Sequence, residues 1–526
     1  MSTLSTARLR ALPGWVATSA ITALVATPVL VLAASVLDPS VEVWVRLWET
    51  RLPGMIRDTV ALLVLVLGGS LVLGTGLAWL VAAHRFPGRR VLGWLLVTPL
   101  AVPGYVAGFV WLDTLSAPLG IRAVRSLWVG ALALTLSLYP YVYLFARAAF
   151  RDVGTAALDA SRTLGNGPLR TFLRVALPMA RPAIAAGGAL VAMEVLTDIG
   201  TVRLFNIGTL ADGVLRVWFG TGDRQAAAEL ATALLAAAVL LIASERMLRR
   251  GAGFTAGGAQ RPLVPQQLPP RRAAAALATV LTVLGLAVGV PLIRLVGWVG
   301  EVGTGAATVA GGLGHHVTST VTIAGIAGLL CLVAGTVLAL NVRHRGRTGR
   351  LLGRVASLGY AMPGPVVAVG AVITLAALDR ALPLPSGVVL VGSVAGVVFA
   401  LVVRYLAVGY QGVDAGLDRV PVETVDSARV LGAGPLRTAL TVELPQARYA
   451  VLAAAALLAI DTVKELPITL LLRPFGVDTL AVWVWQATSE SLWAQAALPS
   501  LAMVAVGMTA VGALLVALER GAEVVS

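Results

Sequence analysis

Long apolar runs constrain this chain more than any other feature of its sequence. Runs of about 20 residues with few charged side chains recur along all 526 positions, and an α-helix needs about that length to cross the hydrocarbon core of a bilayer. Only 13% of the residues are charged and the mean hydropathy is +0.88, whereas soluble globular proteins carry about 25% charged residues. The sequence therefore predicts an all-α membrane protein that crosses the bilayer many times.

We expect about twelve membrane-spanning helices, six in each of two homologous halves. The first half is 1–245, the second is 273–526, and residues 246–272 form a linker rich in arginine, proline and glycine. The expected spans are 15–37, 59–83, 91–112, 127–149, 180–200 and 225–244, followed by 273–298, 319–341, 355–378, 386–409, 448–466 and 495–518. The first apolar run follows two arginines, like a signal peptide, but it is long for a signal core, so we expect it to remain as a span.

One polar stretch occurs twice, at a constant offset of 267 residues. The first copy reads Asp159-Ala160-Ser161-Arg162-Thr163-Leu164-Gly165-Asn166-Gly167-Pro168-Leu169-Arg170 and closes with Leu177-Pro178, and the second reads Asp426-Ser427-Ala428-Arg429-Val430-Leu431-Gly432-Ala433-Gly434-Pro435-Leu436-Arg437 and closes with Leu444-Pro445. Shorter matches pair His84-Arg85 with His344-Arg345 and Val102-Pro103-Gly104 with Met362-Pro363-Gly364. A repeat at this distance indicates two homologous halves rather than a solenoid, whose periods are far shorter.

Each copy of the repeated stretch is expected to fold as helix, turn and helix. Gly165 and Gly432 stand where the first helix needs a left-handed residue to end it, and a second helix can begin at Pro168 or Pro435 without losing a hydrogen bond. The second helices carry apolar residues at helical spacing. Two explanations of these apolar faces stay open: they dock in the groove of a partner protein, or they lie on the membrane surface or the helix bundle.

The charge distribution indicates how the chain is oriented. A net charge of +14 would suggest a nucleic-acid partner in a soluble protein, but basic residues in a membrane protein gather in the cytoplasmic loops, so no nucleic acid is expected. With both termini in the cytoplasm, most of the 40 Lys and Arg residues lie on the cytoplasmic side, together with both repeated stretches and the linker. Residues 198–224 and 464–495 then face outward, where we expect short surface helices.

Acidic residues border the fifth span of each half. Glu194 and Asp198 align with Asp461 and Glu465 at the same offset of 267, and a separation of four places each pair on one helical face. Carboxylates in or beside a span usually face the bundle interior or a water-filled path, so these four are candidates for a translocation path that takes a cation. The alternative is a structural role, in which they cap helix ends or pair with basic neighbours, namely Arg203, Lys464 and Arg473.

Several kinds of site are missing from the sequence. Lys464 is the single lysine and is followed by Glu465, so there is no G-K-[ST] phosphate loop and ATP must be bound by another chain. His315-His316 is an isolated pair, expected in an outer loop, and no cluster has the spacing of metal ligands. The serines lack partners for a hydrolase, and the single Cys331 excludes a disulfide framework. We therefore expect no catalytic residue, metal or cofactor in this chain.

The repeated stretch resembles the signature of permease subunits of ATP-binding-cassette (ABC) importers, E-A-A-x-x-x-G followed by I-x-L-P. Both copies keep its spacing, with Asp for Glu, Ser for one Ala and Val for Ile. In that family the motif forms the coupling helices that dock on the ATPase subunits. The resemblance gives this role to Asp159, Ala160, Ser161, Gly165, Pro168, Leu169, Leu177 and Pro178, and to Asp426, Ser427, Ala428, Gly432, Pro435, Leu436, Leu444 and Pro445.

Four further stretches are similar to fused ferric-iron permeases of this class: 193–201, 216–220, 464–467 and 472–481. The resemblance implies a type I importer permease in the bacterial cytoplasmic membrane, with ferric iron as substrate, two separate ATPase subunits and an extracytoplasmic binding protein. Thiamine permeases share the fused layout, and polyamine, sulfate and phosphonate permeases share the coupling motif. The alternative from another class is an ion-coupled secondary transporter, which would need buried ionisable residues in several spans and no ATPase.

Overall fold

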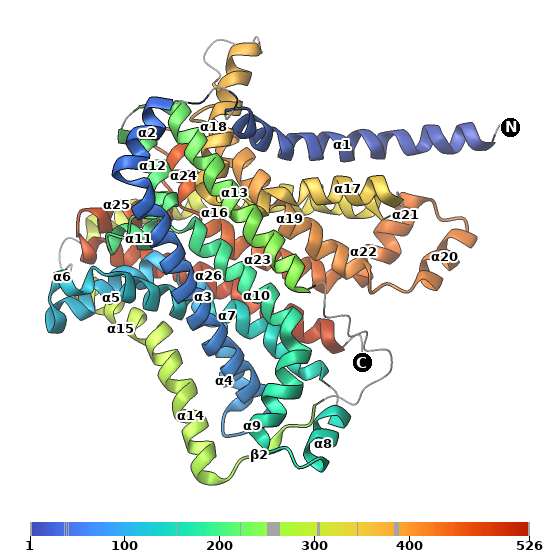
Figure 1. Ribbon diagram of the computed structural model, residues 1–526. Helices are drawn as coiled ribbons and strands as arrows, with labels where there is room; N and C mark the ends of the chain where they lie inside the picture. The colour runs from blue at the N-terminus through green and yellow to red at the C-terminus, as the bar shows by residue number, and fades with distance from the viewer. Residues whose placement is uncertain are drawn as a thin grey trace.

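Figure 1 shows the computed structural model of the chain. The structure describes residues 3–35, 37, 39, 41–153, 155–220, 222–249, 263–301, 306–343, 346–382 and 389–523, so His344, Arg345 and linker residues 250–262 lie outside the described residues. The helices of the first half are α1 (Thr3–Ser35), α2 (Val41–Thr50), α3 (Leu52–Ala83), α4 (Arg89–Leu95), α5 (Gly104–Leu119), α6 (Ile121–Val124), α7 (Leu127–Asp152), α8 (Thr155–Thr163), α9 (Pro168–Thr171), α10 (Leu177–Thr197), α11 (Gly200–Leu204), α12 (Leu210–Gly220) and α13 (Arg224–Arg249). Those of the second half are α14 (Pro270–Leu284), α15 (Val290–Glu301), α16 (Ala306–Val342), α17 (Gly346–Ala356), α18 (Gly364–Ala381), α19 (Val394–Leu417), α20 (Val422–Val430), α21 (Pro435–Thr438), α22 (Leu444–Gln446), α23 (Arg448–Val463), α24 (Pro467–Leu472), α25 (Leu480–Ser489) and α26 (Trp493–Glu523).

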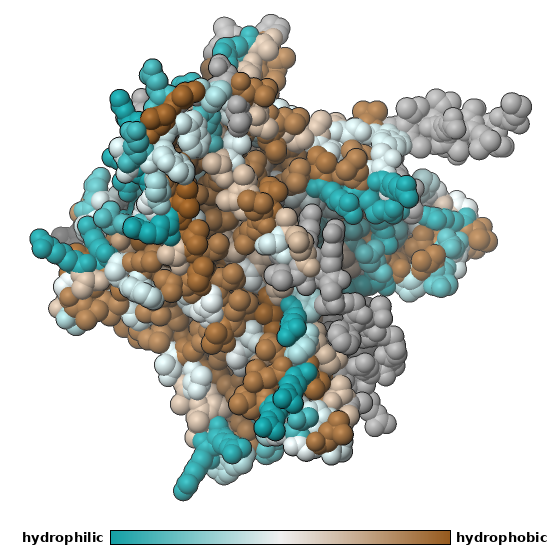
Figure 2. All heavy atoms as spheres, viewed as in Figure 1, coloured by the Kyte–Doolittle hydropathy of each residue, from teal (hydrophilic) through white to brown (hydrophobic). Residues whose placement is uncertain are grey.

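The described helices confirm an all-α membrane protein. Ten of them are long and apolar enough to cross a bilayer, and two bent helix pairs raise the number to as many as twelve. Their outward faces are apolar, as Val60, Val64 and Val72 of α3 illustrate by their exposure. Figure 2 shows apolar side chains over the middle of the molecule and hydrophilic ones toward its margins. This distribution is expected of a protein whose middle is embedded in the bilayer and whose ends are exposed to water.

The chain bends within the predicted span 91–112, which a pair of helices forms rather than one straight helix. Residues 89–101 and the following helix, α5, meet at an angle of 92°. Val102 is extended, with φ −96° and ψ 111°, and Pro103 follows it before α5 begins. A proline disfavours the helical conformation of the residue before it and brings no N–H of its own. The bend is therefore encoded by the Val-Pro-Gly sequence.

The second half breaks at the equivalent place. The predicted span 355–378 is interrupted, since α17 ends at Ala356 and α18 begins only at Gly364. Here Met362 is extended, with φ −92° and ψ 126°, and again precedes a proline. The two halves therefore share this break as well as the repeated stretch.

Each half is built around one tightly packed helix pair, α3 with α7 and α16 with α19. Small residues allow the close approach: a Cβ on Gly335 of α16 would lie 2.5 Å from the backbone nitrogen of Tyr410 in α19. Such small-residue contacts are typical of helix packing in membranes. The first span of the first half crosses to the second half, because α1 packs mainly on α16, α17 and α18. In the second half, α15 packs on α26 of its own half and also contacts α5 of the first. These contacts join the two halves.

The segments expected to carry short surface helices do form short helices, but these are mostly buried. α11 and α12 follow the fifth span of the first half, and α24 and α25 follow that of the second. Asp212 of α12 has no exposed surface, and its carboxylate is held by Arg203 and Arg216. The surface location was wrong because the apolar residues of these segments pack into the bundle rather than onto lipid headgroups.

Candidate functional site

The repeated stretch folds as two helices joined by a tight turn in both halves. The glycines after α8 and α20 are left-handed, as predicted, with φ 79° at Gly165 and 86° at Gly432. Two backbone bonds close each turn: Asn166 N to Ser161 O at 3.1 Å and Gly165 N to Arg162 O at 2.9 Å in the first half, and Ala433 N to Ala428 O and Gly432 N to Arg429 O, both at 3.0 Å, in the second. This pair of bonds is the Schellman motif, which satisfies the last carbonyls of a helix.

The turns carry large apolar side chains into solvent at matched positions. Leu164 is 82% exposed and its counterpart Leu431 is 87% exposed. The same holds at the start of the second helix and one turn further on, for Leu169 with Leu436 and Leu173 with Leu440. Large apolar residues that gather on a surface mark interaction sites rather than packing. The two turns therefore present the same small apolar surface twice.

Both turns lie on one side of the molecule. In Figure 1, α8 and α20 are on the side where α1 begins and α26 ends, whereas α6, α11 and α25 are on the opposite side. Pro168 and Pro435 begin the second helices, as predicted. From there residues 168–197 of the first half form a single span, but residues 435–446 of the second half bend by 76° from α23.

The end of the linker packs beside the first of these turns. β2 (Gln266–Gln267) pairs in parallel with β1 (His84–Arg85). With its oxygen toward α8, the side-chain amide of Gln266 accepts a hydrogen bond from Arg162 at 2.6 Å. Burial lowers the pKa of His84, and the positive charges of Arg162 and Arg89 lower it further. The linker therefore contacts the first turn through the Gln266–Arg162 hydrogen bond and the pairing of β1 with β2.

The acidic residues of the first half lie where α10 ends. Glu194 is in the last turn of α10, and Asp198 is the first residue beyond it. Asp198 caps α11, since its carboxylate accepts hydrogen bonds from the Thr201 hydroxyl at 2.8 Å and the Val202 N–H at 3.1 Å. Among the residues that the structure describes, the Glu194 carboxylate has no hydrogen bond or ion pair.

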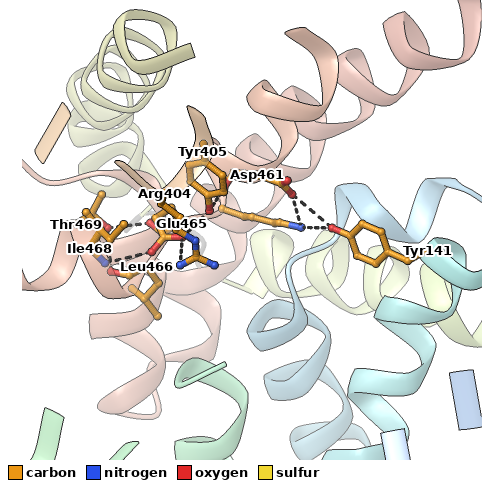
Figure 3. Close-up of polar contacts among 9 residues, drawn as sticks. Tyr141, Arg404, Tyr405, Asp461, Glu465, Leu466, Ile468 and Thr469 are labelled. Carbon is orange, nitrogen blue, oxygen red and sulfur yellow. Dashed lines mark hydrogen bonds and ion pairs between the residues drawn. The ribbon is translucent and has the colours of Figure 1, made fainter. Parts of the chain in front are cut away.

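The acidic residues of the second half are paired with cations (Figure 3). The ammonium nitrogen of Lys464 lies 3.0 Å from the Asp461 carboxylate. Arg404, from α19, lies 2.9 Å from the Glu465 carboxylate, and both are buried. Glu465 also accepts a hydrogen bond of 2.7 Å from the hydroxyl of Tyr405. Pairing of this kind offsets the cost of burying a charge.

A small cavity lies between the halves, lined by both acidic residues of the first half and by Glu465 of the second. It measures about 70 Å³, and a neighbouring cavity of about 40 Å³ shares Glu194, Asp198 and Lys464 in its lining. The charged and polar lining of the larger cavity comes from both halves: Glu194, Thr197 and Asp198 from the first, and Arg404, Lys464 and Glu465 from the second. A space of this size has room for a few water molecules or one small ion.

The structure brings the four predicted carboxylates together but corrects two details. The members of each pair do not share a helical face, because α10 and α23 end before Asp198 and Glu465. Of the expected basic partners, Lys464 does pair with Asp461, whereas the others bind different carboxylates, Arg203 that of Asp212 and Arg473 that of Asp478. Asp198 therefore caps a helix, and Asp461 and Glu465 form ion pairs. Glu194 does neither within the described part of the chain, and it lines the cavity.

Sequence reasoning missed Arg404, Tyr405 and Tyr141. Arg404 is a single charge inside an apolar span, and the offset of 267 places it opposite Ser137 of α7. A charge in the middle of a span is a recognised sign of a functional site, so this signal was available. The tyrosines carried none, because only the fold shows that their hydroxyls reach the carboxylates.

The histidine pair lies in a helix and not in an outer loop. His315 and His316 are part of α16, where their rings lie 3.3 Å and 3.0 Å from the carbonyl oxygens of Gly476 and Asp478. Across the described part of the chain, no group of three or more His, Cys, Asp or Glu residues could hold a metal ion. The pair therefore ties α16 to the loop before α25.

Comparison with known proteins gives matches along most of the chain. The family model described as "Binding-protein-dependent transport system inner membrane component" matches residues 71–248 and again 331–524. The Fe(3+)-transport system permease protein FbpB 2 of Haemophilus influenzae is 28% identical over 456 residues, covering 86% of this chain and 87% of that protein. The sulfate transport system permease protein CysT of Salmonella typhimurium is 29% identical over 47% of this chain and 96% of its own length. The molybdate/tungstate transport system permease protein WtpB of Pyrococcus abyssi is 29% identical over 26% of this chain and 53% of its own length.

Proposed function

The chain belongs to the family of binding-protein-dependent transport system inner membrane components, and on that premise we propose that it is the membrane pathway of an ATP-driven importer for ferric iron. An extracytoplasmic binding protein delivers the solute to the outer face. Two separate ATPase subunits bind and hydrolyse ATP, and this chain performs no chemistry of its own. It lies in the bacterial cytoplasmic membrane with both termini in the cytoplasm.

The observation that carries the iron assignment is the match to a ferric-iron permease across both halves of the chain. The ferric-iron permease aligns with 86% of this chain and 87% of its own length, so both halves take part in the match. The sulfate permease, by contrast, matches through nearly its whole length but covers only 47% of this chain. The cavity supports the same choice, since three carboxylates line it against two basic side chains, Arg404 and Lys464. A net negative lining favours a cation over an oxyanion.

The two matched turns support a pair of identical partners. The turns after α8 and α20, and the helices that follow them, present leucines at matched positions with similar exposures, on the same side of the molecule. Two copies of one ATPase would find the same contact on each half, as a helix lying in a groove. Their closing on ATP would then move α8 and α20 together and rock the two halves about the cavity. Glu194, Asp198, Asp461 and Glu465 would line the path that opens between them.

The proposal is tested by uptake into proteoliposomes that contain this chain, its ATPase and its binding protein. ATP-dependent uptake of iron, with neither thiamine, polyamine, phosphonate, sulfate nor molybdate competing, is the expected result. Uptake of thiamine instead would support an ATP-driven importer but would show that iron is not its substrate. Uptake driven by an ion gradient without ATPase would favour a secondary transporter, for which the buried pairs of Arg404 and Lys464 would be the ionisable groups. One permease chain per two ATPases is the expected stoichiometry.

A further inference from the structure

Lys464 joins the two halves beside the cavity. Its ammonium nitrogen lies 3.0 Å from the Asp461 carboxylate in its own half, and it donates a hydrogen bond of 3.2 Å to the hydroxyl of Tyr141, which belongs to α7 of the first half. The Tyr141 hydroxyl lies 3.4 Å from the same carboxylate oxygen, and Figure 3 shows Tyr141 and Asp461 facing each other across the interface. One ammonium group thus closes a polar contact between the halves.

The carboxylates around this ammonium are not equally satisfied. Glu465 is held by Arg404, and Asp461 by Lys464 itself. Glu194 and Asp198, from the first half, line both cavities together with Lys464, and within the described ranges neither forms an ion pair. The Lys464 ammonium therefore lies beside two further carboxylates that have no ion-pair partner of their own among the described residues.

The residue type is itself informative. Lys464 is the only lysine among the 40 Lys and Arg residues. Every other basic position has arginine, so the exception lies at the cavity. A guanidinium makes rigid, planar, two-pronged contacts, whereas an ammonium is a compact charge on a flexible stem that changes partners easily. Arg404 suits a fixed pair, since its side chain is only 7% exposed. Lys464 suits a cation that moves.

We propose that Lys464 is a tethered cation that holds the path closed and gives way to the transported cation. Its contact with Tyr141 is the part that crosses the interface, so it is lost when the halves separate, while the pair with Asp461 can travel with the second half. Glu194 and Asp198 then face an open, hydrated space without a counter-charge and receive a small cation. The second step rests on the proposed function, because it requires a cationic solute, whereas the closing contact does not.

The test uses a reporter thiol in the cavity. Thr197 lines the cavity and is the first-half counterpart of Lys464 at the offset of 267, so Thr197→Cys places a thiol there, and the chain without this change gives the background from buried Cys331. Membrane vesicles are treated with a cationic and an anionic methanethiosulfonate of similar size. We expect Lys464→Met to speed labelling by both reagents, and by the cationic one about tenfold more. Lys464→Arg should keep the ratio of the two rates.

Equal acceleration of the two reagents, or none, overturns the proposal. If Lys464→Met leaves Asp461 unpaired and the chain does not fold, the double variant Lys464→Met, Asp461→Asn removes both charges together. In that variant both reagents should react faster with an unchanged ratio, and labelling at the original rate overturns the closing role. The measurement needs neither ATPase nor iron. If the chain labels as expected but does not import iron, the assignment of iron as the substrate is wrong, and the proposed role of Lys464 still holds.

Discussion

The two halves are alike where they leave the bundle and unlike where they meet. At the turns after α8 and α20, the same glycine conformation, the same backbone bonds and the same exposed leucines occur twice. At the cavity, the second half has Arg404 and Lys464 where the first half has Ser137 and Thr197. Both halves have the acidic residues, but only the second half also has the basic side chains that pair with them.

The turns and the cavity walls belong to the same repeat, but they are subject to different functional requirements. The two identical partners that we propose would require identical docking surfaces, which would account for the likeness of the turns. The path that we propose between the halves would be used by one solute at a time, so its two walls would be free to differ. The asymmetry leaves the first-half wall with uncompensated negative charge, which a cationic solute can use.

The largest effect is expected from breaking the fixed pair of the second half. Arg404→Met leaves the buried Glu465 carboxylate without its cation, and removal of one partner of a buried pair costs about 3–5 kcal/mol. The midpoint of thermal unfolding in detergent should fall accordingly. At the matched position of the first half, Ser137→Ala should cost no more than about 1 kcal/mol. The double change Arg404→Met, Glu465→Gln should recover most of the loss, and equal losses at 404 and 137 would contradict the asymmetry.

The turns should respond equally in the two halves. Gly165→Val and Gly432→Val each place a branched side chain in the left-handed region, at a cost of about 1–2 kcal/mol, while a Cβ at either position meets nothing within 4 Å. The effect is therefore conformational strain without a clash. ATP-dependent uptake should fall by a similar factor in each variant, with insertion into the membrane retained.

Matched controls for the turns are Gly167→Ala and Gly434→Ala. These glycines have φ −67° and −68°, ordinary values for any residue, and also have open space around them. Both controls should transport normally. Full transport by the double variant Gly165→Val, Gly432→Val would count heavily against a coupling role for these turns.

What could be foreseen from the sequence is local, and what was missed is not. The left-handed Gly165 and the start of a helix at Pro168 follow from the residues within one turn of them, so the sequence predicted both. The bend after Val102 had a visible cause in Pro103, but the apolar run on either side concealed it. The ion pair of Arg404 with Glu465 joins α19 to the end of α23, and no short-range pattern predicts which span meets which.

A smaller effect should distinguish the interiors of the two turns. Ser161 is buried, and its hydroxyl lies 3.1 Å from that of Thr171, whereas the second half has Ala428 at this position. Ser161→Ala should cost about 0.5–1.5 kcal/mol, the net value of one buried hydrogen bond. Thermal unfolding measures it, and the uptake rate should change little because the exposed leucines remain. A large loss of uptake without loss of stability would mean that the partner reads Ser161 directly.

The smallest effect on stability is expected from the acidic residues that open the repeated stretch. Asp159 lies 3.3 Å from Arg162 and Asp426 lies 3.5 Å from Arg429, both one turn along an exposed helix face. Exposed pairs of this kind contribute about 0.2–0.5 kcal/mol, so Asp159→Asn and Asp426→Asn should unfold almost like the unmodified chain. Any loss of ATP-dependent uptake then reports a contact with the partner, and the likeness of the halves requires the two losses to be equal. A loss confined to one variant would extend the asymmetry of the cavity to the docking surface, and the two ATPases would no longer see equivalent sites.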